Sequence, residues 1–568
     1  MFTVEDEVYD KVCAFEIDIL GVFATFFKKY NIINFVDQLI PKNKDNNVTH
    51  GECLVCLMLT HFCFLNTFFY SIDHSLKQLP IPILFGRNIN YDDFSEEVLG
   101  KFLETIHEYG ISLFFTQIAN YIRIQEPNLM NVASLYADTE NFSVIGLNED
   151  ICIDEPCVIY RTSAKNASHD DKLFSLFLLS NSNRIPVFMN TVPENCGKDT
   201  LTNVKEGIEA LKGSVKSGSG IHFIADPSFS ALKNRKAGFS WISRVPDTNA
   251  KAARLIDSQV ELIPMEGDDG YSYFPAKFSY GGIPQSWLLV QSAGMAKKRE
   301  KPFGRKLEKE MAAAKAGLSK LTGRSFEGEE EARKYANDWI AQFKYVKFSK
   351  LLSVSEEQKG TGIRPNKDET RPLTHYLYAE LAFDEEAIEK GRAILGRFIL
   401  ATNDAGLKPT DILTYYKERS LAETTPAHFK WEDFQVSRVL IKNHPRAQGL
   451  ACVMSVSLLV RSILEQKLRL GLKHIDGALF NMPKKSQKYP TLLYAAREFD
   501  GLFLFIFHDN DYKKIKIMII SLDDDAKNII LKALGPDYEL FHYNPEFVLS
   551  HEQREEIIKF LSNDTLSI

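Results

Sequence analysis

The sequence predicts an α/β fold with a mixed sheet, split by an insertion and preceded by an all-helical N-terminal domain. Three observations support this. Residues 134–245 follow the order strand, strand, strand, helix, strand, helix, strand. Residues 247–394 do not continue that order, and a buried type of strand returns at Arg397–Thr402. Residues 1–125 show the apolar spacing of helices instead of strands.

The composition is that of an ordinary globular protein with several domains. The chain has 568 residues, of which 45% are hydrophobic and 25% charged, enough for about two to four domains. A net charge of -7 argues against a protein that coats nucleic acid by charge alone, although it leaves room for a local basic patch. The acidic start MFTVEDEVYD lacks the pattern of a secretory signal.

Apolar stretches and cysteines favour a cytoplasmic protein. Cys53–Tyr70 is interrupted by polar residues and Leu450–Val460 is short, so both are expected to be core helices and not membrane spans. The eight cysteines have no regular spacing, which suggests a reducing compartment. Cys53 and Cys56 lie in an apolar helix without a second Cys/His pair, so we expect core thiols and no zinc site.

The elements follow in order along the chain. In the N-terminal region helices are expected at Ile17–Lys29, Gly51–Phe69 and Val98–Ile124. In the first part of the α/β core, strands are expected at Ser134–Gly146, Leu173–Leu179, Ile185–Val192, Ile221–Ala225 and Phe239–Val245, with helices at Asp199–Leu211 and Ser228–Lys236.

The remaining elements define the insertion and the C-terminal part. The insertion should contain strands at Tyr271–Tyr280 and Trp287–Gln291 and helices at Ala296–Leu321 and Glu329–Phe343. After it we expect helices at Lys408–Phe429 and Arg446–Leu472, then strands at Gly501–Phe507 and Ile515–Ile520. The predicted domains are 1–125 (helical), 126–246 (core, first part), 247–394 (insertion), 395–475 (core, second part) and 476–568 (a small β-rich tail).

Three carboxylates stand where an α/β core could use them. Asp138 lies within the first strand, where a buried carboxylate without a partner would be costly. Asp226 follows the fourth strand directly, and ligand sites in open α/β sheets form at the carboxyl ends of strands. Glu423 lies on the helix after the insertion. A pair of Mg²⁺ ions would neutralise this set and could serve an in-line displacement at phosphate.

The helix with Glu423 carries further charged and polar groups at helical spacing. Tyr416, Arg419, Glu423 and Lys430 have offsets of 0, 3, 7 and 14, which share one face of a continuous helix. Cations beside a carboxylate suit phosphate binding. Pro426 is expected to kink or end the helix, so the common face is predicted for the first three residues and is in question for Lys430.

These segments together resemble the prokaryotic insertion-sequence DDE transposases, which have an RNase H-like catalytic core. The resemblance lies in YADTENFSVIG around Asp138, FIADPSFSALKN around Asp226, then GRFILATN and DILTYYKERSLAE around Glu423, in the order of that family. The resemblance is to the large group marked by a Tyr-x2-Arg-x3-Glu-x6-Lys signature, in which hairpin-forming cut-and-paste enzymes are found. Its more specific part is the three acids in this order, with an insertion between the second and the third. The helical N-terminal region resembles a domain that precedes this core in one branch of the family.

The resemblance implies roles for these residues. Asp138, Asp226 and Glu423 correspond to the catalytic, metal-binding triad, which holds two Mg²⁺ ions, with Mn²⁺ as an alternative. Tyr416, Arg419 and Lys430 correspond to residues that hold the transposon end. The activity implied is metal-dependent cleavage at the transposon ends and strand transfer into target DNA by a cut-and-paste route through a hairpin. The implied partners are double-stranded DNA, as terminal inverted repeats and target, and a second copy in a homodimeric synaptic complex. The location is the bacterial cytoplasm, at the nucleoid when bound to DNA.

A basic cluster in the insertion is the other candidate DNA contact. It includes Lys297, Lys298 and Arg299, which either track phosphates of the transposon end or form a solvated helix face. Two rival functions remain open: a catalytically inactive, transposase-derived DNA-binding protein, and a host RNase H-like nuclease without strand transfer. Trp287 is expected to be a core residue of its strand.

Overall fold

The computed structural model describes the chain except residues 1, 5–6, 43–45, 64–75, 146–158, 162–170, 193–199, 213–219, 226–237, 268–269, 281–282, 358–372, 425–442, 476–489, 521–524, 546–548 and 563–568. The chain divides into two units. Unit 1 comprises Met1–Ala225, Ala237–Trp241 and Thr414–Ile568, and unit 2 comprises Asp226–Lys236 and Ile242–Leu413. The predicted insertion, 247–394, falls within unit 2.

Helices dominate the N-terminal part of unit 1. They are α1 (Leu20–Lys29), α2 (Ile32–Leu39), α3 (His50–Cys63), α5 (Ile81–Phe85), the 3-10 helix η2 (Tyr91–Phe94), α6 (Glu96–Tyr109) and α7 (Ile111–Gln125). The predicted helix Val98–Ile124 is two helices, because Gly110 between them adopts φ +99°, a left-handed conformation that breaks the helical ladder. Cys53 and Cys56 are buried in α3, as expected, and burial raises the pKa of the Cys53 thiol to about 12.

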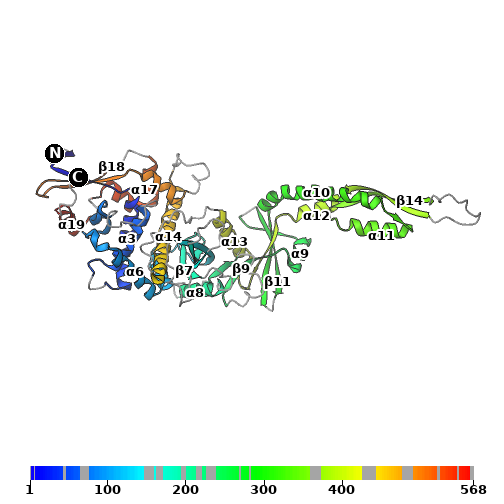
Figure 1. Ribbon diagram of the computed structural model, residues 1–568, viewed down its shortest axis with the longest axis horizontal. Helices are drawn as coiled ribbons and strands as arrows, with labels where there is room; N and C mark the ends of the chain where they lie inside the picture. The colour runs from blue at the N-terminus through cyan, green and yellow to red at the C-terminus, as the bar shows by residue number, and fades with distance from the viewer. Residues whose placement is uncertain are drawn as a thin grey trace, which may run out of the picture. The chain divides into compact units, whose positions relative to one another are not determined.

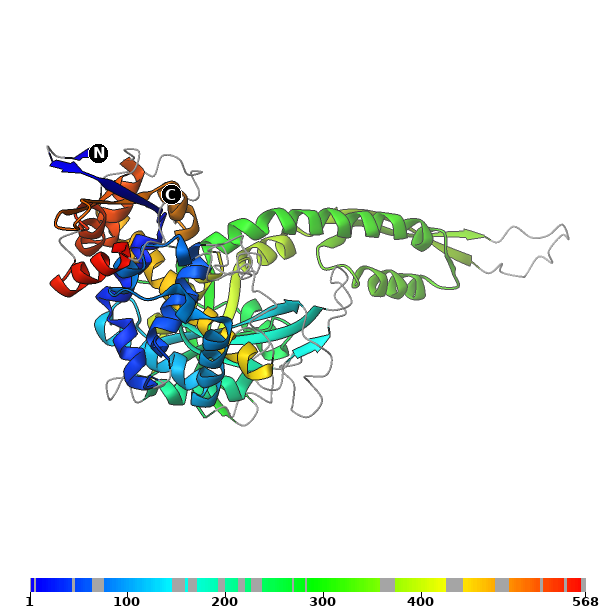
Figure 2. The ribbon, with the colours of Figure 1, turned by 60° about the vertical axis from the view of Figure 1, so that its left-hand side comes forward.

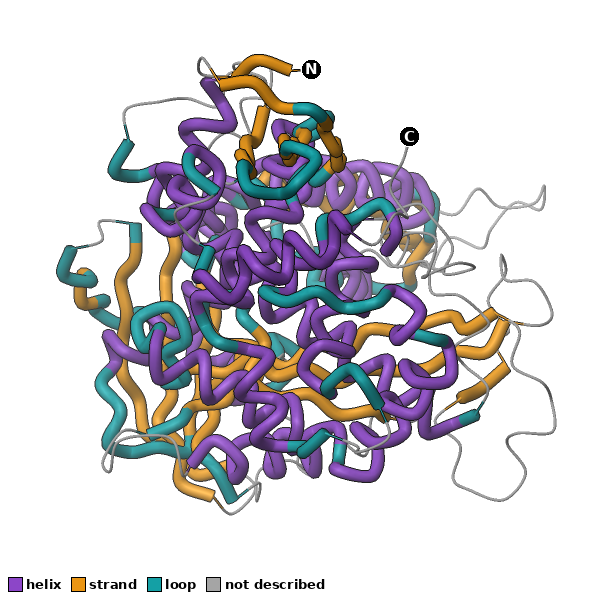
Figure 3. The backbone as a smooth tube through the Cα atoms, turned by 90° about the vertical axis from the view of Figure 1, so that its left-hand side faces the viewer, coloured by secondary structure: helices purple, strands orange, loops and turns teal. Residues whose placement is uncertain are grey.

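The prediction of an all-helical N-terminal domain is wrong for the first residues. The chain begins with strands β1 (Phe2–Val4), β2 (Glu7–Tyr9) and β3 (Lys11–Glu16), and Figure 3 shows the N-terminus as strand. β3 pairs antiparallel with β17 (Phe503–His508), from near the other end of the chain. Strand β3 is short and lies in an acidic segment, and its Phe15 side chain is buried. Its pairing partner, β17, lies almost 500 residues further along the chain.

The C-terminal part of unit 1 mixes helices with a small sheet, so the predicted β-rich tail is also wrong. Strand β17 lies between β3 and β18 (Ile515–Ile520). The other elements are helical: α16 (Leu492–Ala496), η8 (Arg497–Phe499), α17 (Asp525–Leu534), α18 (Pro536–Tyr543) and α19 (His551–Ser562). Helical apolar spacing explains α17, where Ile530, Leu531 and Leu534 are buried together.

The mixed α/β character of the core is confirmed in the sheet of unit 1. Strand β4 (Ser134–Ile145) lies between β8 (His222–Ala225), which runs parallel to it, and β6 (Asp171–Asn181), which runs antiparallel. Strands β5 (Ile159–Arg161) and β7 (Pro186–Val192) both pair with β6. Helix α8 (Thr200–Lys212) packs on β6 and β7.

A long buried helix, α14 (His444–Leu472), forms the centre of unit 1. It contacts α3, α6, α7, α17 and β7. Among the described residues it is long and apolar enough to cross a membrane, but 94% of its most apolar stretch is buried inside the protein, as expected for a core helix. Some of its polar residues bond within the helix: the Ser455 hydroxyl donates to the Ala451 carbonyl at 2.8 Å, and the Glu465 carboxylate pairs with Arg469.

Unit 2 contains a run of antiparallel strands and an extended arm. The strands lie in the order β10 (Ile263–Pro264), β11 (Tyr271–Tyr280), β12 (Ile283–Ser292), β16 (Arg397–Thr402) and β9 (Ser240–Val245), of which residues 242–245 belong to this unit. Helix α9 (Ala250–Asp257) contacts β16. Trp287 on β12 is buried, and its indole N–H donates to Gln285 at 2.9 Å, which confirms it as a core residue.

The arm consists of α10 (Ala293–Thr322), β13 (Ser325–Phe326), α11 (Glu329–Ile340), the hairpin β14 (Val346–Glu357) and β15 (Leu373–Phe383), and α12 (Glu385–Ala393). Figures 1 and 2 show α10 running alongside the hairpin. Apolar residues of α10 and α11 cover one face of it, in clusters that include Leu321, Ala336 and Leu377. Periodic apolar residues inside a highly charged helix therefore build the core of the arm.

Candidate functional site: the junction of strand β4 and helix α13

Asp138 lies on β4, which pairs with β6 on one side and with β8 on the other. Because side chains alternate along a strand, Ser134, Tyr136 and Asp138 project from the same face of β4. Ser134 is buried and Tyr136 half-buried, whereas the Asp138 side chain is exposed. A carboxylate thus reaches solvent at this point of a strand that is paired with both β6 and β8.

Helix α13 (Pro409–Thr424) packs on this same face of β4. The Tyr136 hydroxyl donates a hydrogen bond to the Tyr415 carbonyl at 2.9 Å, and the Ser134 hydroxyl donates to the Glu418 carboxylate at 3.2 Å. The Tyr415 ring stacks on His222 of β8, with ring centroids 5.6 Å apart and planes at 26°. Three contacts therefore join the helix to two adjacent strands; we call this set the β4–α13 junction.

Glu418 is a titratable group of the junction. Burial raises the pKa of its carboxyl, because the charged form loses water, and the hydrogen bond from Ser134 opposes that effect. Residue spacing alone did not predict a role for Glu418, Tyr415 or His222. For Tyr415 and Glu418, the available signal was the interruption of apolar spacing by TYYKE on a helix that must pack on a sheet.

The predicted face of α13 lies next to the packed one. Tyr415 and Glu418, three residues apart, share the stripe that contacts the sheet. Tyr416, Arg419 and Glu423 occupy the neighbouring stripe, about 100° further round the helix. Tyr416 is half-buried. Arg419 and Glu423 lie in α13, but their side chains are outside the described part of the structure, as is the whole of Lys430.

The metal site stays a prediction. Strand β8 ends at Ala225, and Asp226 itself lies outside the described residues. The described residues contain no group of three or more His, Cys, Asp or Glu side chains that could hold a metal ion. Because two of the three predicted carboxylates are beyond that description, this absence does not bear on the triad.

The predicted basic cluster lies at the start of α10 in unit 2. Lys297 and Lys298 are exposed and Arg299 is half-buried, and the helix begins with Ser292 as its N-cap. The nearby Glu300 pairs with Arg392 at 3.0 Å. The cluster therefore presents cations to solvent, as either a phosphate-binding surface or a solvated helix face would require.

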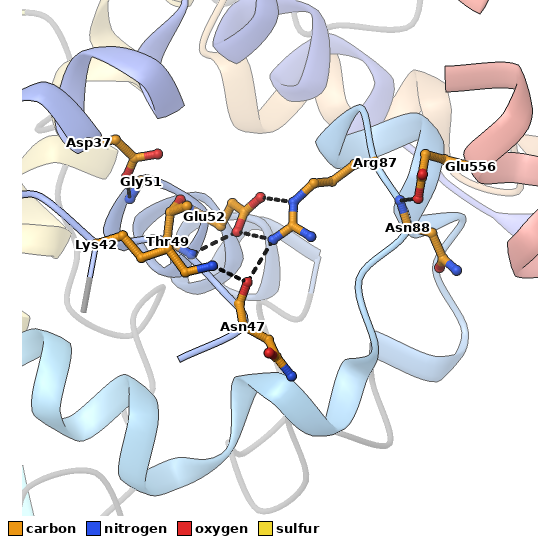
Figure 4. A network of polar contacts seen from close by, with 9 residues as sticks. All are labelled: Asp37, Lys42, Asn47, Thr49, Gly51, Glu52, Arg87, Asn88 and Glu556. Atoms are coloured by element: carbon orange, nitrogen blue, oxygen red, sulfur yellow. Dashed lines mark hydrogen bonds and ion pairs between the residues drawn. The ribbon is translucent and has the colours of Figure 1, made fainter. Parts of the chain in front are cut away.

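Figure 4 shows a separate polar network in the helical part of unit 1. Two of its residues, Glu52 and Arg87, line a cavity of about 730 Å³. Thr49 and Glu52 form a reciprocal capping box at the start of α3, with bonds of 2.8 and 3.1 Å. Arg87 donates to both carboxylate oxygens of Glu52, which is almost fully buried, and Glu52 raises the pKa of Arg87. Because this cation is already matched by a carboxylate, the network primarily fixes the position of α3.

Comparisons with known proteins give two findings. Residues 13–120 match the family described as DUF4277, a domain of unknown function. The chain also aligns with a cryo-EM structure of the piggyBac transposase synaptic complex with hairpin DNA, at 9% identity over 98% of this chain and 87% of that one, with a TM-score of 0.29. A search of curated proteins finds no match. The TM-score is too low to support a shared fold, so functional conclusions depend on the residues of this chain.

Proposed function

We propose that the protein is a DNA transposase of the prokaryotic insertion-sequence DDE type, with an RNase H-like core. Its substrates would be the terminal inverted repeats of a mobile element and target DNA. Asp138, Asp226 and Glu423 are the proposed catalytic carboxylates. The proposal rests on the order of motifs around these three residues and on the surroundings of Asp138.

The observation that carries the proposal is the shared face of β4. Asp138 projects from the face on which Ser134 and Tyr136 hydrogen-bond helix α13. That helix is the one that contains Glu423. Strand β8 runs parallel to β4 with Tyr136 opposite Ile224, so positions 138 and 226 each lie two residues further along the chain. A strand carboxylate, a following carboxylate on the parallel neighbour and a helix packed on the same face are the parts such a site requires.

A divalent cation fits the proposed residues by the chemistry of their donors. Carboxylate oxygens are the ligands that Mg²⁺ prefers, and Asp138 presents an exposed carboxylate. Bound Mg²⁺ would supply Lewis-acid activation of water and phosphate. Asp138, Asp226 and Glu423 would hold the ions, and Arg419 would bind the phosphate next to the cut. Tyr416 would position that phosphate or a displaced nucleotide.

The same proposal assigns the rest of the reaction. The freed 3′ hydroxyl would attack a phosphodiester, first in a hairpin step and then in target DNA. Lys430 and the cluster Lys297, Lys298 and Arg299 would contact the transposon end. Two ends must be brought together, which requires at least a homodimer during the reaction. The transposition reaction would take place at the nucleoid, in the bacterial cytoplasm.

A nicking and joining assay tests the proposal. The full-length chain is incubated with Mg²⁺ and DNA that carries the inverted repeats flanking its coding region. We expect nicked and joined products from the unmodified chain, and at least a 100-fold lower rate for Asp138→Asn and Asp226→Ala, because a metal-binding carboxylate is lost. Glu209→Gln, an exposed carboxylate on α8, is the matched control and should retain full activity.

The outcomes separate the three functions. DNA binding without any nicking by the unmodified chain would overturn the enzyme and favour the inactive DNA-binding protein. Nicks without joined products would favour a host nuclease. Unchanged activity of Asp138→Asn would remove Asp138 from the catalytic set.

A further inference from the structure

One face of the β14–β15 hairpin in the arm is apolar and exposed. The other face packs against α10 and α11 through residues such as Leu351 and Leu377. On the exposed face, 45% of Leu352, 48% of Val354, 37% of Tyr376 and 49% of Tyr378 is accessible. The register places Leu352 opposite Tyr378 and Val354 opposite Tyr376, so these four side chains form one continuous patch. We call it the hairpin patch.

Strand β14 also lies at the edge of its sheet. The strand order is β13, β15, β14, and no other described strand pairs with the outer side of β14. The strand is 12 residues long. A long edge strand presents unpaired backbone N–H and C=O groups along its length, which is a template for pairing with another strand. The apolar patch and the edge share strand β14, so a strand that pairs with this edge also brings its own side chains beside Leu352 and Val354.

The sequence of β14 is complementary to itself in one antiparallel register. Lys350 precedes the centre of the strand and Glu356 follows it, with Leu352 and Val354 between them. If two copies pair about Ser353, Lys350 stands opposite Glu356 of the second copy and Leu352 opposite Val354. A shift of the centre to 352 or 354 instead places a charge opposite an apolar side chain. Opposite charges and apolar pairs directly across a ladder stabilise it.

We propose that the β14 edge, with Leu352 and Val354 of the hairpin patch, forms a two-fold interface with a second copy of this chain, paired antiparallel about Ser353. The two hairpins then form one sheet, and the two patches become continuous. An isologous contact of this kind closes on itself and gives a dimer and not a fibre.

The charges on the exposed face favour a protein partner over nucleic acid. Lys350 and Glu380 stand opposite each other, and the Lys350 ammonium lies 5.5 Å from the centre of the Tyr378 ring. The Tyr378 hydroxyl donates to Glu380 at 2.9 Å. With Glu356 and Glu380 on this face beside Lys350, a phosphate backbone would meet two carboxylates and one cation there.

Sedimentation of the full-length chain without DNA tests the interface. The unmodified chain should show a concentration-dependent monomer–dimer equilibrium. Glu356→Lys, which sets an ammonium in place of the carboxylate opposite Lys350 of the second copy, should raise the dissociation constant at least tenfold. Glu389→Lys, the same charge change at an exposed position of α12, is the control and should change it less than twofold. Equal thermal unfolding midpoints would show that both variants are folded.

Cysteine crosslinking tests the register. A mixture of Leu352→Cys and Val354→Cys chains should form an oxidised, covalent dimer more readily than either variant or the unmodified chain alone. A monomer at every concentration, equal effects of Glu356→Lys and Glu389→Lys, or no preference for the mixture would overturn the proposal. It would also be overturned if Glu356→Lys strengthened binding to duplex DNA without affecting self-association. Since no DNA is needed, failure here is separate from failure of the transposase activity.

Discussion

Removing the Tyr136 hydroxyl is the most direct test of the β4–α13 junction. Tyr136→Phe keeps the ring and its packing and deletes the hydrogen bond to the Tyr415 carbonyl, which is 2.9 Å long. The bond joins the strand that carries Asp138 to the helix that carries Glu423. Losing it should therefore loosen α13 from β4 without disturbing the rest of the sheet.

The expected magnitude follows from the type of bond. A neutral hydrogen bond of ordinary length contributes about 1 kcal/mol net. If opening of α13 is the exchange-competent step, amide hydrogens at the C-terminal end of this helix should exchange about fivefold faster. Hydrogen exchange followed by mass spectrometry of peptides within 409–424 measures this locally, which suits a chain of two units better than one global unfolding curve.

A tyrosine outside the junction provides the control variant. Tyr121→Phe removes a hydroxyl from α7, where the ring stacks on Phe35 with centroids 3.9 Å apart. It should leave exchange in α13 unchanged. Unchanged exchange in α13 of Tyr136→Phe, or equal acceleration across all of unit 1, would show that this bond does not anchor the helix.

Three other perturbations have clear expected results. Gly396→Ala should lower the thermal unfolding midpoint by several degrees, because φ is +83° and an added Cβ would meet a backbone oxygen at 2.4 Å, whereas Gly304→Ala in open space on α10 should not lower it. Burial lowers the pKa of His542 to about 4. Since the unfolded side chain takes up a proton near pH 6.5 and the folded one does not, stability should fall as pH drops from 6.5 to 4, by on the order of 2–3 kcal/mol, and His542→Gln should flatten that slope in urea titrations. Arg87→Met should cost about 3–5 kcal/mol in the same titrations, because it leaves the buried Glu52 charge unpaired, and the double variant with Glu52→Gln should recover part of the loss.

Local patterns predicted most elements because their causes are local. Tyr271–Tyr280, Arg397–Thr402 and Ile515–Ile520 are strands with the expected bounds, since their β-branched and aromatic residues favour the extended chain. The predicted helix over 98–124 was wrong at one residue. Apolar spacing continues through Gly110, but its positive φ divides the segment.

The strands at the N-terminus could not be predicted in the same way. Residues 11–16 have little local preference, and they are extended because β17 offers a partner edge from the far end of the chain. Because most of residues 20–125 is helical, the whole segment 1–125 was predicted to be helical. The C-terminal tail was predicted to be β-rich because its two strands have clear patterns, whereas its several short helices do not.

The candidate site shows the same division. The order of Asp138, Asp226 and Glu423 along the chain, and the element types that hold Asp138 and Glu423, could be read from residue spacing. The face of α13 that contacts the sheet could not be predicted in this way. Every face of a polar helix fits the helical repeat equally well, and only the packing shows which face is used. Tertiary structure selected the stripe of Tyr415 and Glu418.

Residue type and spacing therefore predict most helices and strands of the core and the chemical groups available to it. Three features follow from packing instead: Asp138 projects from the face of β4 on which α13 packs, β3 joins β17, and no described strand pairs with the outer side of β14. Those features depend on contacts between residues far apart in the chain, and no local pattern encodes which distant partner completes a surface.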